Sequence, residues 1–196
     1  MNAQRILLIQ GHPDGAARHL CHELAEAYAA GAAEGGHALR RLDISTLEFP
    51  LLRSVQDWEH GEVPEPLRPA QQDILWCSHL VLVFPLWLGD MPALLKGFLE
   101  QVARPGFAFH RGAKNPMQAK ALDGRSARVI VTMGMPALIY RYVFHAHSVK
   151  SLERNILGFV GFAPVRETLV GGVDQLGEAG VLGWRDKLRV LGRDGV

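Results

Sequence analysis

One stretch constrains the fold of this chain more than any other: an apolar run that ends at a proline and leads into a helix pattern. Residues 80–84 read Leu-Val-Leu-Val-Phe, without the alternation of a strand that has one face in water. Such a run is typical of a strand buried on both faces of a parallel sheet. The helix is expected from Pro92 to Val102, with Pro92 in its first turn and Asp90 as its cap.

Strand and helix patterns alternate along the rest of the chain. Strands are predicted at residues 5–10, 37–43, 80–84, 127–132 and 165–170, and helices at 16–33, 71–78, 92–102, 149–157 and 176–191. This alternation predicts a parallel sheet covered by helices on both faces. For five strands with right-handed crossovers, the common solution is the flavodoxin-like order 2-1-3-4-5. We therefore predict an α/β, flavodoxin-like three-layer sandwich, formed by a single domain over residues 1–196.

Residues 44–69 do not fit that alternation. They contain four prolines and several charges, and they are too long for a plain connection between two elements. We expect a surface excursion that Phe49, Leu51 and Leu52 pack down at one end.

Composition excludes several classes of protein. The 196 residues are 48% apolar and 21% charged, which is typical of a soluble globular protein. The net charge of +1 favours neither a nucleic acid nor an acidic membrane as partner. No apolar run is long enough for membrane insertion, and no leader pattern precedes the first strand, so a cytoplasmic protein is expected. Cys21 and Cys77, without a C-x-x-C pair, are predicted to be buried thiols rather than a disulfide or metal ligands.

In the predicted topology, three loops with unusual chemistry open on one edge of the sheet. Loop A (residues 11–19, G-H-P-D-G-A-A-R-H) enters a helix, so backbone N–H groups and the helix dipole favour an anion there. His12, Arg18 and His19 offer further donors for a phosphate, although a single loop histidine is more often only solvated. The loop matches neither the nucleoside-triphosphate motif nor G-x-G-x-x-G.

Loop B (residues 85–89, Pro-Leu-Trp-Leu-Gly) is apolar where such loops are usually polar. It follows the buried strand, at the edge where open α/β sheets bind ligands. Leu86, Trp87 and Leu88 could wall a flat apolar ligand, or they could form a small core beneath another loop.

Loop C (residues 132–136, Thr-Met-Gly-Met-Pro) lets the backbone approach a ligand closely at Gly134. Tyr140, His145 and His147 follow, and such groups can stabilise negative charge on an electron acceptor, although each could also be a surface residue. Together the loops describe an anion site beside a planar apolar ring, which is the shape of flavin mononucleotide. No acid pair, nucleophile triad or metal-ligand cluster competes at this edge.

At these loops the sequence resembles the flavodoxin-like NAD(P)H:quinone oxidoreductase family, which includes DT-diaphorase, the drug-activity modulators and the potassium-efflux ancillary reductases. The resemblance covers nearly the whole chain and is carried by Gly11-His12-Pro13, Phe84-Pro85-Leu86-Trp87, residues 91–97 (M-P-A-L-L-K-G), Gly106-Phe107-Ala108-Phe109, residues 132–135 with Tyr140, and residues 158–162 (G-F-V-G-F).

The resemblance implies a flavin held by all three loops. The implied cofactor residues are His12, Ala17, Arg18, His19, Pro85, Leu86, Trp87, Leu88, Thr132, Met133, Gly134, Met135 and Tyr140, with Trp87, Phe109 and Met135 beside the substrate. It further implies a homodimer, in which Phe109 reaches the partner's pocket. Residues 16–19 lack the family's usual hydroxyl or amide side chains, and the chain lacks the longer C-terminal region of the FAD-binding members, so FMN is favoured over FAD.

The implied reaction is a ping-pong, two-electron transfer of hydride from NAD(P)H through flavin N5 to a quinone. Tyr140 and a nearby histidine would be the catalytic residues. Ala146 occupies the family's histidine position, and of its two neighbours, His145 and His147, we favour His145. The alternatives are a reductase of azo compounds, nitro compounds or metal ions at the same site, a flavin-binding regulatory subunit of a membrane transporter, and a one-electron carrier, which the near-neutral charge disfavours.

Overall fold

The computed structural model describes residues 3–112, 115 and 120–196. Its centre is a five-stranded, all-parallel sheet in the order β2-β1-β3-β4-β5, as predicted. The strands are β1 (Arg5–Gln10), β2 (Ala38–Asp43), β3 (His79–Pro85), β4 (Ser126–Thr132) and β5 (Val165–Val170). β3 is buried along its whole length, which confirms the interpretation of the apolar run.

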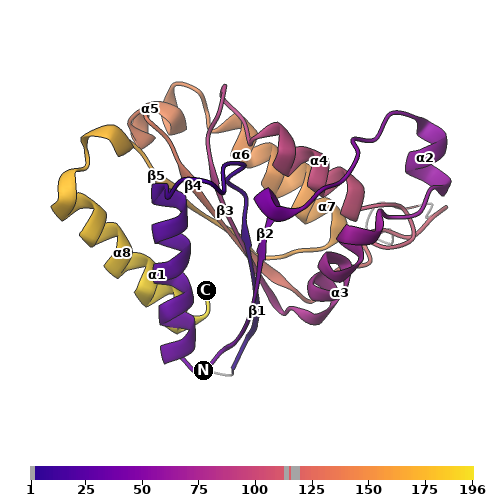
Figure 1. The fold of residues 1–196 in the computed structure, drawn as a ribbon, viewed down its shortest axis with the longest axis horizontal. Coiled ribbons are helices and arrows are strands. Elements are labelled where there is room, and N and C mark those ends of the chain that lie inside the picture. The colour runs from indigo at the N-terminus through magenta and orange to yellow at the C-terminus, as the bar shows by residue number, and fades with distance from the viewer. Residues whose placement is uncertain (1–2, 113–114, 116–119) are drawn as a thin grey trace.

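Helices cover both faces of the sheet (Figure 1). One layer consists of α1 (Leu20–Glu34) and α8 (Gly177–Asp194). These two helices pack closely because each presents a glycine to the other: a Cβ at Gly31 would lie 1.9 Å from the carbonyl oxygen of Arg189, and a Cβ at Gly192 would lie 2.0 Å from that of Tyr28. A side chain at either position would force the helices apart.

The opposite layer contains α3 (Arg68–Trp76), α4 (Ala93–Val102) and the helical segment formed by α6 (His147–Ser151), a π-helical turn (Leu152–Leu157) and α7 (Gly158–Val160). The short helix α5 (Ala137–Tyr142) lies beyond the end of β4. Each layer has its own apolar core: Leu24, Tyr28 and Leu188 anchor the first, and Phe84, Leu95 and Phe98 anchor the second. Both cysteines are buried, as predicted.

Among the helix starts that differ from the sequence prediction, those of α1 and α4 each involve a carboxylate. α1 begins at Leu20 rather than residue 16, because Asp14 Oδ1 accepts the N–H groups of Ala16 (2.9 Å) and Ala17 (3.3 Å) and holds them in a loop. The predicted cap at Asp90 is wrong: α4 begins at Ala93 after Pro92, and Asp90 Oδ1 accepts the N–H of Met91 at 2.7 Å.

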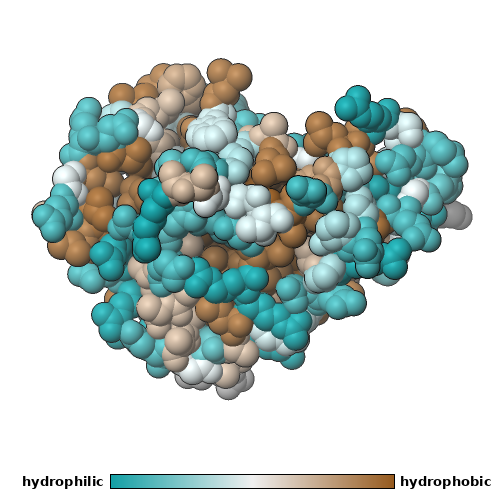
Figure 2. Space-filling model, in the orientation of Figure 1, coloured by the Kyte–Doolittle hydropathy of each residue, from teal (hydrophilic) through white to brown (hydrophobic). Residues whose placement is uncertain are grey.

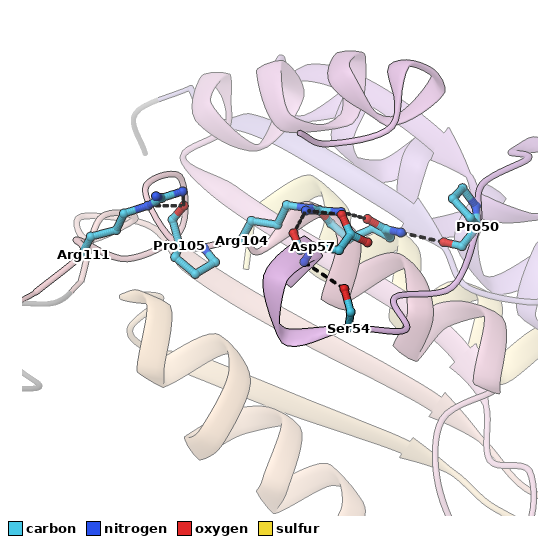
Figure 3. Close-up of polar contacts among 7 residues, drawn as sticks. Pro50, Ser54, Asp57, Arg104, Pro105 and Arg111 are labelled. Carbon is cyan, nitrogen blue, oxygen red and sulfur yellow. Dashed lines mark hydrogen bonds and ion pairs between the residues drawn. The ribbon is translucent and has the colours of Figure 1, made fainter. Parts of the chain in front are cut away.

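Residues 44–69 form an excursion, as predicted, and its helix α2 (Val55–His60) projects from one end of the molecule (Figure 1). Phe49 packs against Phe98, whereas the Leu51 side chain is exposed. Ile44 and Leu67 are buried in the core, and polar contacts add to this attachment (Figure 3). The buried Arg104 donates to the backbone oxygen of Asp57 and to Gln101, and Gln101 Nε2 donates to the Pro50 oxygen at 2.6 Å.

The excursion also contains two single-turn 3₁₀ segments, Ile44–Thr46 and Glu65–Leu67, and a third, Val173–Gln175, precedes α8. In the part of the chain that the structure describes, no helix combines the length and the apolar character needed to cross a bilayer.

Candidate active site

The structure brings loops A, B and C together at the carboxyl edge of β1, β3 and β4. The N–H of Gly11 donates to the Val83 oxygen at 2.7 Å, and the N–H of Leu86 donates to the Thr132 oxygen at 2.7 Å. The rings of His12 and Trp87 meet edge to face with centroids 5.6 Å apart. The three loops therefore adjoin one another at the edge where sheets of this topology bind ligands.

Loop A is built around an imidazole cluster. His12 is 5% exposed, and its Nδ1 accepts the N–H of Asp14 at 3.1 Å. His19 stacks on it with ring centroids 4.0 Å apart, and His22 lies 5.3 Å from it. Burial, together with these two imidazoles, holds the pKa of His12 below its ordinary value, so its ring is neutral at pH 7.

Three of the anion donors of loop A, two backbone N–H groups and His19 Nε2, already have a partner within the chain. The carboxylate of Asp14 accepts from Ala16 and Ala17, and its Oδ2 lies 2.8 Å from His19 Nε2. These contacts lower the pKa of Asp14, with the His19 hydrogen bond as the largest cause. Arg18 is exposed. The donor set is the kind that binds an anionic oxygen, and it therefore fits a phosphate.

Loop B faces outward. The Trp87 side chain is 49% exposed, and Leu88 is fully exposed, which argues against a small core formed by these two residues. Trp87 and Asp90 exchange backbone hydrogen bonds of 2.8 and 3.0 Å, closing a tight turn. Leu88 has φ of 47°, an unfavourable conformation for a branched side chain, and such strain clusters at functional sites. Pro85 is buried as the last residue of β3.

In loop C, the backbone rather than the first two side chains faces the edge. Thr132 is buried, with its hydroxyl 3.0 Å from Cys21 Sγ, and Met133 belongs to the core. Gly134 is exposed and Met135 is partly buried. Within the described residues, the N–H groups of Gly134, Met135 and Leu88 make no hydrogen bond, whereas those of Leu86 and Trp87 do. The three unused donors suit the polar edge of a heterocycle.

Tyr140 is 2% exposed, and its hydroxyl lies 2.5 Å from Ser148 Oγ. That hydroxyl also accepts the N–H of Val149 at 3.3 Å. His145 and His147 are both exposed, with ring centroids 5.5 Å apart, and neither hydrogen-bonds Tyr140. His145 has φ of 54°, a second strained residue at this edge. The structure thus joins Tyr140 to Ser148, which no sequence pattern indicated, and not to His145.

Phe109 lies in a separate apolar groove. Its ring contacts those of Trp58 (6.2 Å) and Phe159 (5.2 Å), not Trp87 or Met135. The groove has a volume of about 540 Å³, and Leu99, Ala103 and Ile156 also line it. The three predicted substrate residues are therefore not assembled within one chain.

A second apolar surface, the α5 surface, is formed by α5 and the two residues after it, where Leu138, Tyr142, Val143 and Phe144 are 52 to 70% exposed. Figure 2 shows apolar side chains gathered along the upper edge of the molecule, where α5 lies. An exposed apolar patch of this kind is typical of an interaction surface.

Comparison with known proteins places the chain in a family. Residues 4–186 match the family described as having a flavodoxin-like fold. The chain is 30% identical over 164 residues to the NAD(P)H oxidoreductase YcaK of Escherichia coli (strain K12), covering 78% of this chain and 81% of that protein. It is 29% identical over 143 residues to the FMN-dependent NADH:quinone oxidoreductase of Shewanella amazonensis, covering 65% of this chain and 69% of that protein. The chain belongs to this flavodoxin-like fold family, which confirms the resemblance.

Solved structures agree on the fold. The NAD(P)H:quinone oxidoreductase from Methanothermobacter marburgensis superposes with a TM-score of 0.80 at 22% identity, over 98% of this chain and 97% of that one. An FMN-dependent NADH-azoreductase from Bacillus anthracis, solved in complex with FMN, gives a TM-score of 0.73 at 16% identity, over 97% and 98% of the two chains. At these identities the likeness supports the fold alone.

Proposed function

We propose that this protein is an FMN-dependent NAD(P)H dehydrogenase that reduces quinones. One observation carries the proposal: three loops meet at the carboxyl edge and supply an anion donor set, an exposed indole and unused backbone donors. Relatives that share the fold are named NAD(P)H oxidoreductase and FMN-dependent NADH:quinone oxidoreductase. The FMN dependence of the Shewanella relative and the chemistry of the edge support the same cofactor.

The residues at the edge fit FMN. Loop A would hold the phosphate, Trp87 would lie against the ring system, and the N–H groups of Leu88, Gly134 and Met135 would meet its heteroatoms. When bound, flavin would supply the two-electron redox chemistry between NAD(P)H and the acceptor.

The chain's own groups would orient the ring and offset charge. Tyr140 is positioned by Ser148 and by the N–H of Val149, so its hydroxyl has a fixed direction. His145 is exposed and can exchange protons with solvent. We assign Tyr140 to charge stabilisation and His145 to proton supply.

We further propose a cytoplasmic homodimer. The apolar α5 surface and the Phe109 groove are both exposed in one chain, and pairing them between two copies would bury both. Phe109 of one copy would then complete the substrate pocket beside Trp87 and Met135 of the other.

The test is the purified protein itself. It should be yellow, release FMN on denaturation, and oxidise NADH or NADPH when a benzoquinone is added. Replacing the benzoquinone with an azo dye in the same assay tests the alternative that the protein is an azoreductase. A colourless protein that neither FMN nor FAD reconstitutes would overturn the proposal.

A further inference from the structure

The carboxylate of Asp14 occupies the donors that a flavin phosphate would need. It accepts from the Ala16 N–H at 2.9 Å, the Ala17 N–H at 3.3 Å and His19 Nε2 at 2.8 Å. The Asp14 side chain is 42% exposed and comes from the loop itself, so it can move away from these donors without disturbing the apolar core on either face of the sheet. The sequence offers no hydroxyl or amide side chain at residues 16–19 to replace these donors.

An independent feature beside the carboxylate also points to an anion. The Nδ1 of the buried His12 ring accepts the Asp14 N–H, so the neutral ring carries its proton on Nε2. Within the described residues, that Nε2–H has no acceptor. His12 stacks on His19, so its ring lies beside the ring that Asp14 holds, with centroids 4.0 Å apart. A phosphate oxygen bound at loop A would supply an acceptor for this donor.

His22 has a different part in the cluster. Its Nδ1 accepts the N–H of His19 at 3.1 Å, which fixes the start of α1. His19 is the ring that hydrogen-bonds the carboxylate, and it is therefore the member of the cluster that a competing anion would contact.

We propose that Asp14 is an intramolecular competitor of the flavin phosphate, and that it sets how strongly the protein prefers FMN over riboflavin. Phosphate and carboxylate are both anions and need the same three donors, so binding of one displaces the other. Because riboflavin has no phosphate, it binds without this exchange. The inference rests on the proposed flavin site.

The experiment compares dissociation constants of FMN and riboflavin, measured by quenching of flavin fluorescence, for the flavin-free protein and three variants. Asp14→Asn keeps the shape and an acceptor oxygen but loses the charge. It should bind FMN about tenfold more tightly and riboflavin within about twofold of the parent. Asp186→Asn, on the exposed face of α8, is the matched charge control and should change neither constant.

His19→Gln should weaken FMN but not riboflavin, because it removes one donor. Circular dichroism and thermal unfolding of each variant establish that it is folded. FMN affinity that is unchanged or weaker in Asp14→Asn, with riboflavin binding intact, overturns the competitor role and leaves the flavin site standing. If neither flavin binds any of the four proteins, the proposed function fails and the inference with it.

Discussion

The hydroxyl of Tyr140 lies 2.5 Å from Ser148 Oγ, across the loop that separates α5 from α6. This contact fixes the orientation of the residue that the sequence singled out for catalysis, and it makes Ser148 a positioning residue. Removing the Tyr140 hydroxyl by Tyr140→Phe should slow quinone reduction more than it weakens FMN retention, since the ring still fills its place in the core. Stopped-flow turnover and the FMN dissociation constant measure the two effects.

Ser148→Ala offers the matched comparison. It leaves the Tyr140 hydroxyl in place but removes the partner that orients it. Turnover should therefore fall less than in Tyr140→Phe, and again by more than FMN retention weakens. His147→Gln, which has no hydrogen bond to Tyr140, should leave turnover unchanged. Equal turnover in Tyr140→Phe and the parent would reduce Tyr140 to a wall of the pocket.

Trp87→Ala should loosen the flavin without unfolding the protein. The indole is half exposed, so its removal should cost less than about 1 kcal/mol of stability. If it lies against the flavin ring, the rate of FMN release should rise about tenfold or more, because aromatic contacts contribute about 1 kcal/mol or more beyond area burial. Trp184→Ala on α8, away from the loops, is the control. An unchanged rate of FMN release in Trp87→Ala would show that Trp87 does not contact the cofactor.

The protein should lose stability in mild acid because of His79. Burial is the largest cause that lowers the pKa of this 2% exposed ring to about 4, and Arg128 contributes next. The unfolded chain has an ordinary value of about 6.5, so between pH 4 and 6.5 it binds more protons than the folded chain. The free energy of unfolding should therefore be constant above pH 7 and fall by about 2 kcal/mol between pH 7 and 5 through this residue.

Urea unfolding at pH 5, 6 and 7 measures that slope. His79→Asn retains an acceptor for Ser126, which lies 2.7 Å from His79 Nδ1, and it should flatten the profile. If the free energy of unfolding of His79→Asn falls with pH as steeply as that of the parent, groups other than His79 cause the loss of stability.

Arg104 should stabilise the α2 excursion. Its guanidinium is buried and donates to Asp57 and Gln101 (Figure 3). Arg104→Ala leaves those acceptors unpaired and should cost about 2 to 3 kcal/mol in urea unfolding, with faster proteolysis between residues 50 and 62. Arg111→Ala is the control, since its side chain is exposed and its contacts with the Pro105 oxygen, at 3.4 Å, are weak. Equal stability of the two variants would show that apolar packing alone holds the excursion.

The sheet could be predicted from the sequence because its strands carry their own signal. Residues 80–84 and 6–9 are apolar throughout, and that composition is typical of a strand buried on both faces. The predicted start of α1 was wrong, because a side-chain contact from Asp14 overrode the local helix preference of residues 16–19.

The site was predicted in outline but not in its contacts. The three loops share an edge through topology alone, which the order of elements determines. The partners of Tyr140 and of the loop A donors depend instead on loop conformations, including the positive φ angles of His145 and Ala146, which no periodic pattern encodes. For the contacts within loop A, the sequence held one usable signal. His22 stands three residues after His19, which is the spacing of a capping box.

The most direct test of the account is an anaerobic titration of the FMN-loaded protein with NADH or NADPH, followed in the visible flavin absorption band. We predict that one equivalent of reductant bleaches the band and that one equivalent of benzoquinone restores it, with turnover when both are in excess. A protein that holds no flavin, or whose bound flavin keeps its colour in the presence of both nicotinamide donors, would contradict the proposed function.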